Sequence, residues 1–205
     1  MKKLIALCVV AAVAVALSFN AHAGRFGVKA GVNVTNINLE NIESSSVMGY
    51  QAGLTWQFDL PLGFAIQPDI MYHVKSSHLP DFDQPIGLGY VEVPVNIQWG
   101  LRLANKSLRI FAQASPFAGY AIAQVGETKD LFVDENGNKW SNINRFSYGA
   151  GLGAGLQFGF LQLTATYNWD FGNTIKGKEF EELFNKSNFN GYTVSLTVML
   201  GKKKK

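Results

Sequence analysis

The chain has 205 residues, among them 18 Lys and Arg against 15 Asp and Glu, and 16% of its residues are charged. Soluble domains usually carry about 25% charged residues, so this composition is poor in the groups that a water-facing surface needs. Charge is nearly balanced and no basic face with interleaved aromatic residues occurs, which argues against a nucleic-acid-binding protein.

Residues 1–23 have the pattern of a cleavable secretory signal peptide. Two lysines precede an apolar run at residues 4–19, and Ala21-His22-Ala23 provides a small-residue cleavage site. The run is shorter than the roughly 20 residues of a spanning helix. We expect cleavage after Ala23, which also removes the sole cysteine, Cys8. The exported domain, residues 24–201, must then fold without disulfide bonds.

From Gly24 onward, apolar residues recur at every second position, which is the period of a β-strand. Each such segment approaches or exceeds the roughly 9 to 11 residues with which a tilted strand crosses a bilayer. The segments are residues 26–35, 49–58, 64–72, 91–101, 110–120, 148–158, 161–171 and 192–200.

The connections between these segments alternate between long and short. The short ones are residues 59–63, 103–107 and 159–160, and the long ones are 37–47, 75–87, 125–145 and 172–190. Outer-membrane barrels have short periplasmic turns and long outer loops. The sequence therefore predicts an all-β fold, a closed up-and-down antiparallel transmembrane β-barrel of eight strands.

A membrane barrel and a soluble lipocalin-like periplasmic binder both have strands in which apolar and polar residues alternate. The positions of the aromatic residues distinguish between them. With strands running alternately up and down, the apolar face has aromatic residues at both ends and aliphatic residues between them. Such belts match the two membrane interfaces. The short-turn belt is Phe26, Trp56, Phe58, Phe64, Trp99 and Phe158, and the long-loop belt is Tyr50, Tyr72, Tyr120, Tyr148, Trp169, Phe171 and Tyr192.

Four blocks carry a family resemblance: GVKAGVNVTN at 27–36, YVEVPVNIQW at 90–99, SPFAGYAI at 115–122, and the glycine- and aromatic-rich run at 148–174. They resemble the outer-membrane β-barrel domain family of gram-negative bacteria that includes the PorT-like proteins. The resemblance covers essentially the whole exported chain, and it implies a fold and a cell-envelope location rather than an activity. Such barrels typically end on an aromatic residue, whereas this chain ends with a polybasic tail at 202–205.

Charged residues on the polar face point into the predicted lumen. They are Lys29, Asp69, Glu92 and Arg109. Isolated charges in a narrow lumen are costly, so we expect a paired polar network with a structural purpose. Eight strands enclose a lumen that side chains can fill, so we expect no open pore.

Four glycines follow one another on the inward face of the sixth segment: Gly149, Gly151, Gly153 and Gly155. Their spacing differs from that of a phosphate-binding glycine loop. We interpret it as room for bulky inward residues such as Phe111 and Phe117; a ligand slot is the alternative.

No catalytic, cofactor or metal motif occurs. His73, His78, Asp81 and Asp83 gather near the second long loop, but their spacing matches no metal-ligand pattern, and we expect them to be solvated. Residues 134–138 resemble the start of a calcium loop, yet Lys139 replaces its glycine, and Asn136-Gly137 is typical of a hairpin tip.

The long loops are acidic, and residues 178–186 have apolar side chains at helical spacing, which predicts a short amphipathic helix. The leading hypothesis is an outer-membrane barrel that anchors and displays its loops, with membrane lipid and an envelope protein as partners. The alternative is a barrel enzyme acting on lipid or peptide at the membrane rim, with His73 or His78 as its acid–base group.

Overall fold

The computed structural model describes residues 24–38, 45–78, 86–103, 107–126, 145–172 and 188–200. The predicted signal peptide, the hairpin tip at 134–138, the loop helix at 178–186 and the tail at 202–205 lie outside these residues. No helix within the described ranges is long and apolar enough to cross a membrane.

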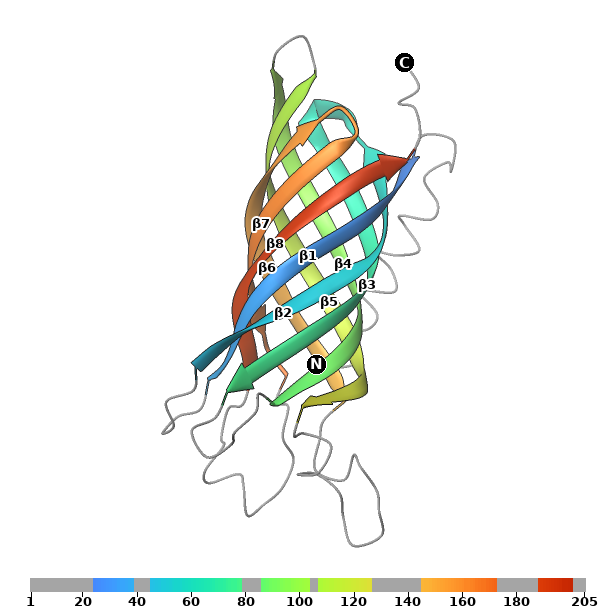
Figure 1. The fold of residues 1–205 in the computed structure, drawn as a ribbon. Coiled ribbons are helices and arrows are strands. Elements are labelled where there is room, and N and C mark those ends of the chain that lie inside the picture. The colour runs from blue at the N-terminus through green and yellow to red at the C-terminus, as the bar shows by residue number, and fades with distance from the viewer. Residues whose placement is uncertain are drawn as a thin grey trace, which may run out of the picture.

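Eight antiparallel strands form one closed barrel in chain order, because β1 pairs with both β2 and β8 (Figure 1). The prediction of the fold class is therefore confirmed. A short 3-10 turn, η1 (Pro61–Gly63), connects β2 to β3. The strands are β1 (Gly24–Asn38), β2 (Ser45–Asp59), β3 (Phe64–His78), β4 (Ile86–Leu103), β5 (Leu108–Gly126), β6 (Phe146–Phe158), β7 (Leu161–Asp170) and β8 (Asn188–Leu200).

Most strands continue further toward the long loops than the alternation indicates, and β3 and β5 continue furthest. The predicted loop at 75–87 is wrong at both of its ends, since β3 extends to His78 and β4 begins at Ile86. Between its pairs with His73 and Ser77, β2 has one residue more than β3, which is a β-bulge. The sequence pattern does not reveal the end of β3 because the apolar residues stop after Val74, where the strand continues with the polar run 75–78.

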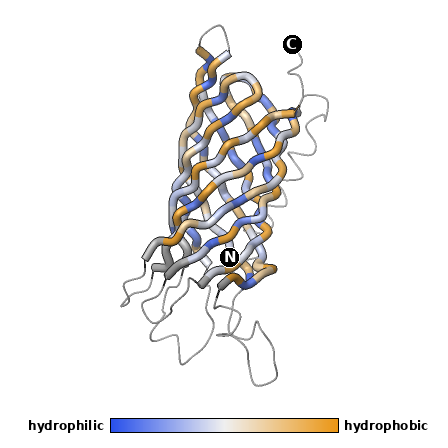
Figure 2. The backbone as a smooth tube through the Cα atoms, in the orientation of Figure 1, coloured by the Kyte–Doolittle hydropathy of each residue, from blue (hydrophilic) through white to orange (hydrophobic). Residues whose placement is uncertain are grey.

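Hydrophobic and hydrophilic residues alternate along the strands (Figure 2), and the outer face of the barrel is apolar whereas its lumen is polar. Outward Leu152 and Leu196 are 56% and 50% exposed, whereas inward Gln162 and Thr197 are fully buried. A soluble lipocalin-like barrel would place its apolar face inward, so the structure contradicts that alternative. The exposed aliphatic wall instead suits hydrocarbon as its solvent.

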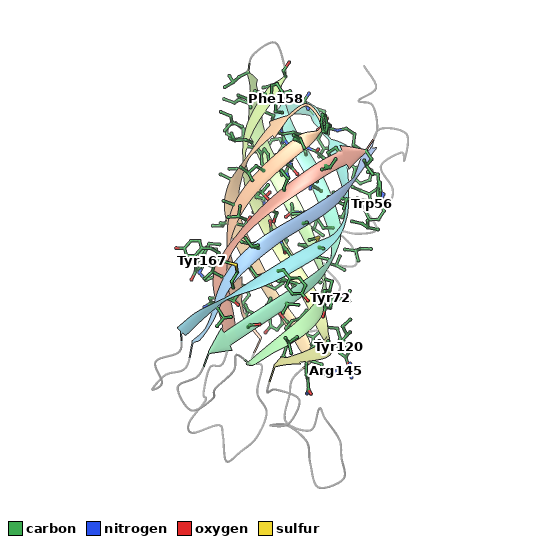
Figure 3. The ribbon with its side chains drawn as sticks, in the orientation of Figure 1. Trp56, Tyr72, Tyr120, Arg145, Phe158 and Tyr167 are labelled. Carbon is green, nitrogen blue, oxygen red and sulfur yellow. The ribbon has the colours of Figure 1, made fainter. Side chains whose placement is uncertain are left out.

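The predicted aromatic belts lie at the two ends of the outer wall, and Figure 3 labels Phe158 and Trp56 toward one end and Tyr72 and Tyr120 toward the other. The rings of Phe26 and Trp56 contact each other at a tilt of 59°, with centroids 5.2 Å apart. Sequence reasoning missed Tyr167, whose ring lies 4.7 Å from that of Tyr192 and 4.8 Å from that of Trp169. These contacts extend the long-loop belt across β7 and β8.

The glycine face of β6 accommodates aromatic rings of β5. A Cβ atom built on Gly149 would lie 2.5 Å from the Phe117 ring, and one on Gly155 would collide with the Phe111 ring. Register explains the contacts, because Phe117 pairs with Gly149 and Phe111 with Gly155. The glycines thus allow two large inward side chains to fit within a narrow barrel.

We expect Gly155→Val to destabilise the barrel by about 1–3 kcal/mol, because the added side chain overpacks the site against Phe111 and the β7 backbone. The measurement is the urea midpoint of folding into lipid vesicles. Ala154→Val, which adds the same kind of bulk on the outward face, is the matched control and should leave the midpoint nearly unchanged. Equal midpoints for both variants would contradict this account of the glycine face.

Candidate functional site in the polar lumen

A cluster of ion pairs spans the lumen in the half nearer the long loops. Lys75 Nζ lies 2.6 Å from Glu92 Oε1 and 3.3 Å from Asp170 Oδ2, so it connects β3 to β4 and to β7. His73 Nδ1 lies 2.9 Å from Glu92 Oε2. The ammonium group of Lys75 also lies over the ring of Phe117, 4.9 Å from its centroid. All four titratable side chains are buried.

A second ion pair lies nearer the middle of the barrel. Lys29 Nζ contacts Asp69 Oδ2 at 2.8 Å, and Asp69 is fully buried. The carboxylate also accepts hydrogen bonds from Thr55 Oγ1 and, at 2.9 Å, from Asn96 Nδ2. Ser115 Oγ in turn donates to Asn96 Oδ1 at 2.7 Å. This carboxylate therefore has several partners, as a charge in a low-dielectric interior requires.

Glutamine side chains fill the lumen in the half nearer the short turns. Gln67 Oε1 accepts from Gln98 Nε2 at 2.9 Å and from Gln162 Nε2 at 3.2 Å, which joins β3, β4 and β7 across the interior. The side-chain amides of Gln57 and Gln157 lie in contact, and with the Gln157 amide oriented to suit its neighbours its oxygen accepts from Arg25 Nη2 at 2.8 Å. We call these five glutamines the glutamine layer. Each is almost completely buried.

The structure divides the four predicted lumen charges among three places. Lys29 contacts Asp69, while Glu92 contacts His73 and Lys75. Arg109 instead donates to Gln98 Oε1 at 2.7 Å and to the Gly63 carbonyl oxygen at 3.2 Å.

Sequence reasoning missed three of the buried charges in the lumen, Arg25, Lys75 and Asp170, and misplaced the side chain of His73. Lys75 falls in the predicted loop at 75–87 but belongs to β3. The expectation that His73 is solvated is wrong, since it is 5% exposed inside the barrel. His73 and Lys75 both lie an even number of residues after Asp69, and residues of β3 at such positions share its inward face. This spacing could have indicated from the sequence that both side chains point into the lumen.

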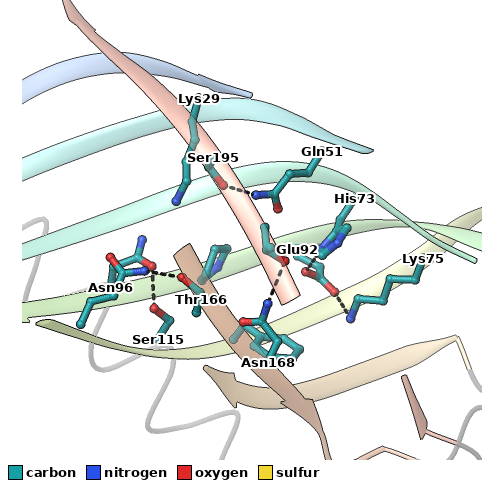
Figure 4. A pocket seen from close by; sticks show the side chains of 14 residues that line it. Lys29, Gln51, His73, Lys75, Glu92, Asn96, Ser115, Thr166, Asn168 and Ser195 are labelled. Carbon is teal, nitrogen blue, oxygen red and sulfur yellow. Dashed lines mark hydrogen bonds and ion pairs between the residues drawn. The ribbon is translucent and has the colours of Figure 1, made fainter. Parts of the chain in front are cut away.

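A cavity of about 50 Å³ lies beside the Lys75 cluster, and Lys75 itself lines it (Figure 4). Its lining includes Lys29, Gln51, His73 and Glu92 together with hydroxyl and amide groups from β5, β7 and β8. A water molecule needs at least about 10–15 Å³ of such space, so the cavity holds only a few waters. A lipid or a peptide does not fit.

No group of three or more His, Cys, Asp or Glu side chains suited to a metal ion occurs within the part of the chain that the structure describes. Asp81 and Asp83 lie outside that part, and so does the calcium-like segment at 134–138. His73 Nε2 has no hydrogen-bond partner among the described residues. The His73–Glu92 pair could orient an imidazole for proton transfer, but it faces a cavity that is closed to large substrates.

We expect Lys29→Met to destabilise the barrel by about 3 kcal/mol, because it leaves the fully buried Asp69 carboxylate without a cation. Chemical denaturation monitored by the heat-modifiable gel shift and by tryptophan fluorescence measures the change. Lys29→Met combined with Asp69→Asn removes the charge as well and should recover much of the loss. An unchanged midpoint in Lys29→Met would count against this role of the pair.

Lys75→Met should cost more than Lys29→Met, about 3–5 kcal/mol, because two buried carboxylates lose their shared cation. Adding Asp170→Asn should restore part of the stability by relieving the repulsion between Glu92 and Asp170. The same denaturation assay measures which of the two variants, Lys75→Met or Lys29→Met, loses more stability. A smaller loss in Lys75→Met than in Lys29→Met would show that the two carboxylates do not depend on Lys75.

A family model described as outer membrane protein beta-barrel domain matches residues 18–176. No curated protein sequence matches the chain. Three solved outer-membrane proteins are similar in structure, each 10% identical in sequence, and at such identity the likeness shows the fold alone.

OprG from Pseudomonas aeruginosa has a TM-score of 0.53, with 88% of this chain and 97% of that chain covered. Neisserial surface protein A has a TM-score of 0.45, with 85% and 97% covered. Ail of Yersinia pestis, solved in complex with the heparin analogue sucrose octasulfate, has a TM-score of 0.44, with 86% and 99% covered.

The finer resemblance to PorT-like proteins stays a prediction. The family match, however, spans well over half of the chain, and the structure supplies a barrel with an apolar exterior and a polar interior. The chain therefore belongs to the outer membrane protein β-barrel domain family, and its location is the outer membrane.

Proposed function

We propose that this barrel is a non-conducting outer-membrane anchor whose role is structural or interactive: it holds its long loops at the cell surface for contact with an envelope partner. The observation that carries the proposal is the filled lumen. The glutamine layer and the Lys75 cluster each join strands on opposite sides of the barrel.

Two physical features support a closed barrel over a pore. The cavity beside the Lys75 cluster is about 50 Å³ and holds only a few water molecules, too little for a hydrated solute. The side chains of each layer are also joined to one another, so opening either layer breaks buried hydrogen bonds or ion pairs. Separating a buried pair costs several kcal/mol, and this cost makes spontaneous opening rare.

The enzyme alternative needs an acid–base group at the membrane rim. His73 instead lies inside the barrel, with its ring bonded to Glu92. His78 ends β3, and its side chain lies outside the described part of the chain. The arrangement of His73 therefore favours a structural role for it in the lumen, and we propose no catalytic residue.

Proteoliposomes containing the purified barrel should not swell in isotonic arabinose, and planar bilayers should show no discrete conductance steps. Liposomes with an open porin are the positive control. Replacing Gln67, Gln98 and Gln162 together with Ala should thin the glutamine layer and raise the frequency of conductance events. Steady solute uptake by the unmodified barrel at porin rates would overturn the proposed closed state.

A further inference from the structure

Charges in the two halves of the lumen are compensated differently. From the middle of the barrel to its long-loop end, Lys29 and Lys75 contact the carboxylates of Asp69, Glu92 and Asp170. At the short-turn mouth, the described charged residues are the guanidinium groups of Arg25, Arg102 and Arg109 and the single carboxylate of Asp59. We call these four residues the mouth cluster.

Asp59 is shared by two of the three arginines. Its Oδ2 lies 3.0 Å from Arg102 Nη2 and 3.8 Å from Arg25 Nη2. Arg109 is the register partner of Arg102 in the β4–β5 ladder, so the third guanidinium belongs to the same end of the barrel. Among the described residues of the mouth cluster there are therefore three positive charges and one negative charge, which leaves the mouth with a net positive charge.

Neutral oxygens, rather than further carboxylates, hold two of these arginines in place. Arg25 donates to Gln57 Oε1 at 2.8 Å, and Arg109 donates to Gln98 Oε1 at 2.7 Å and to the Gly63 carbonyl oxygen at 3.2 Å. Such acceptors orient a guanidinium without cancelling its charge. Both side chains are buried, whereas Arg102 is 34% exposed and has N–H groups available to the solvent at the mouth.

The direction in which the side chains of the mouth cluster point limits which ligands can reach them. Asp59, Arg25 and Arg109 follow the inward parity of their strands, and Arg102 has the parity of the inward Gln98. An anion therefore approaches along the barrel axis from the side of the short turns, which is the periplasmic side in this class of barrel. Lipid phosphates surround the outer wall of the barrel. They therefore face the outer surface and not the inward-pointing side chains of the mouth cluster.

An exposed apolar residue flanks this entrance. Leu62 in η1 is 88% exposed and has φ 60°, a left-handed conformation that is costly for a leucine. It follows Pro61 and precedes Gly63, whose carbonyl oxygen accepts from Arg109. The same turn thus presents an apolar side chain to the solvent and positions one guanidinium of the mouth cluster.

We propose that the short-turn mouth is a docking site for an acidic segment of a periplasmic protein, with a carboxylate bound by Arg102 in the positive field of Arg25 and Arg109, and with Leu62 as an adjoining apolar contact. The site lies at the opposite end of the barrel from the long loops. It is independent of whether the barrel conducts, so failure of the proposed function leaves it intact.

Fluorescence anisotropy of a fluorescein-labelled peptide of alternating glutamate and leucine tests the docking site, with the full exported chain folded in neutral detergent micelles. Arg102→Gln should weaken binding about fivefold, as loss of one partly exposed ion pair predicts. Asp59→Asn should strengthen binding about threefold, since it removes the competing carboxylate. Both effects should shrink as NaCl is raised.

Arg145→Gln is the matched control, because it removes the same charge next to β6 at the long-loop end, where Arg145 Nε donates to Ala121. Its affinity for the peptide should equal that of the unmodified chain. Equal weakening in Arg102→Gln and Arg145→Gln would mean that net charge alone binds the peptide, which overturns the site. An unchanged affinity in both Arg102→Gln and Asp59→Asn, with the heat-modifiable fold intact, also overturns it.

The remaining possible outcome is that the mouth cluster binds a lipid headgroup instead of a peptide. If Arg102→Gln weakens binding to phosphatidylglycerol vesicles but leaves peptide affinity unchanged, the cluster recognises headgroups and the proposal is wrong. If Arg102→Gln weakens peptide binding alone, the peptide assignment stands.

Discussion

Hydrocarbon offers no hydrogen-bond partners, so the backbone of this barrel has to satisfy itself through a closed sheet. Closure occurs where β1 meets β8, from the pair of Phe26 with Leu200 to that of Asn38 with Asn188. Once the sheet is closed, each strand has one face toward lipid and one toward the lumen. The distribution of apolar, polar and aromatic side chains follows from this single constraint.

The narrow interior creates the second requirement, because polar side chains without water must find partners among themselves. The structure meets it with layers of different chemistry: glutamines near the short turns, the Lys29–Asp69 pair near the middle, and the Lys75 cluster near the long loops. Glycines on β6 provide the volume for Phe111 and Phe117. Stability and closure of the lumen thus have the same origin.

The two ends of the barrel differ in charge, and this difference bears on function. Buried lysines near the long loops have matching carboxylates, whereas the mouth cluster retains positive charge. A matched cluster mainly resists opening and rigidifies the wall. An unmatched one can attract a charged partner. An anchor with a closed lumen is compatible with both, since neither role requires transport through the barrel.

Periodicity in the sequence was enough to determine the eight strands, the closed fold, the outward apolar face and the inward positions of Lys29, Asp69, Glu92 and Arg109, because side-chain direction in a strand alternates strictly. Which of these charges meet was decided by the tertiary structure alone. Register and tilt bring Lys75 of β3 to Asp170 of β7, far apart in sequence, and the polar end of β3 lacks the apolar alternation that would mark Lys75 as a strand residue. Pairing across a lumen depends on barrel closure, which no local pattern encodes.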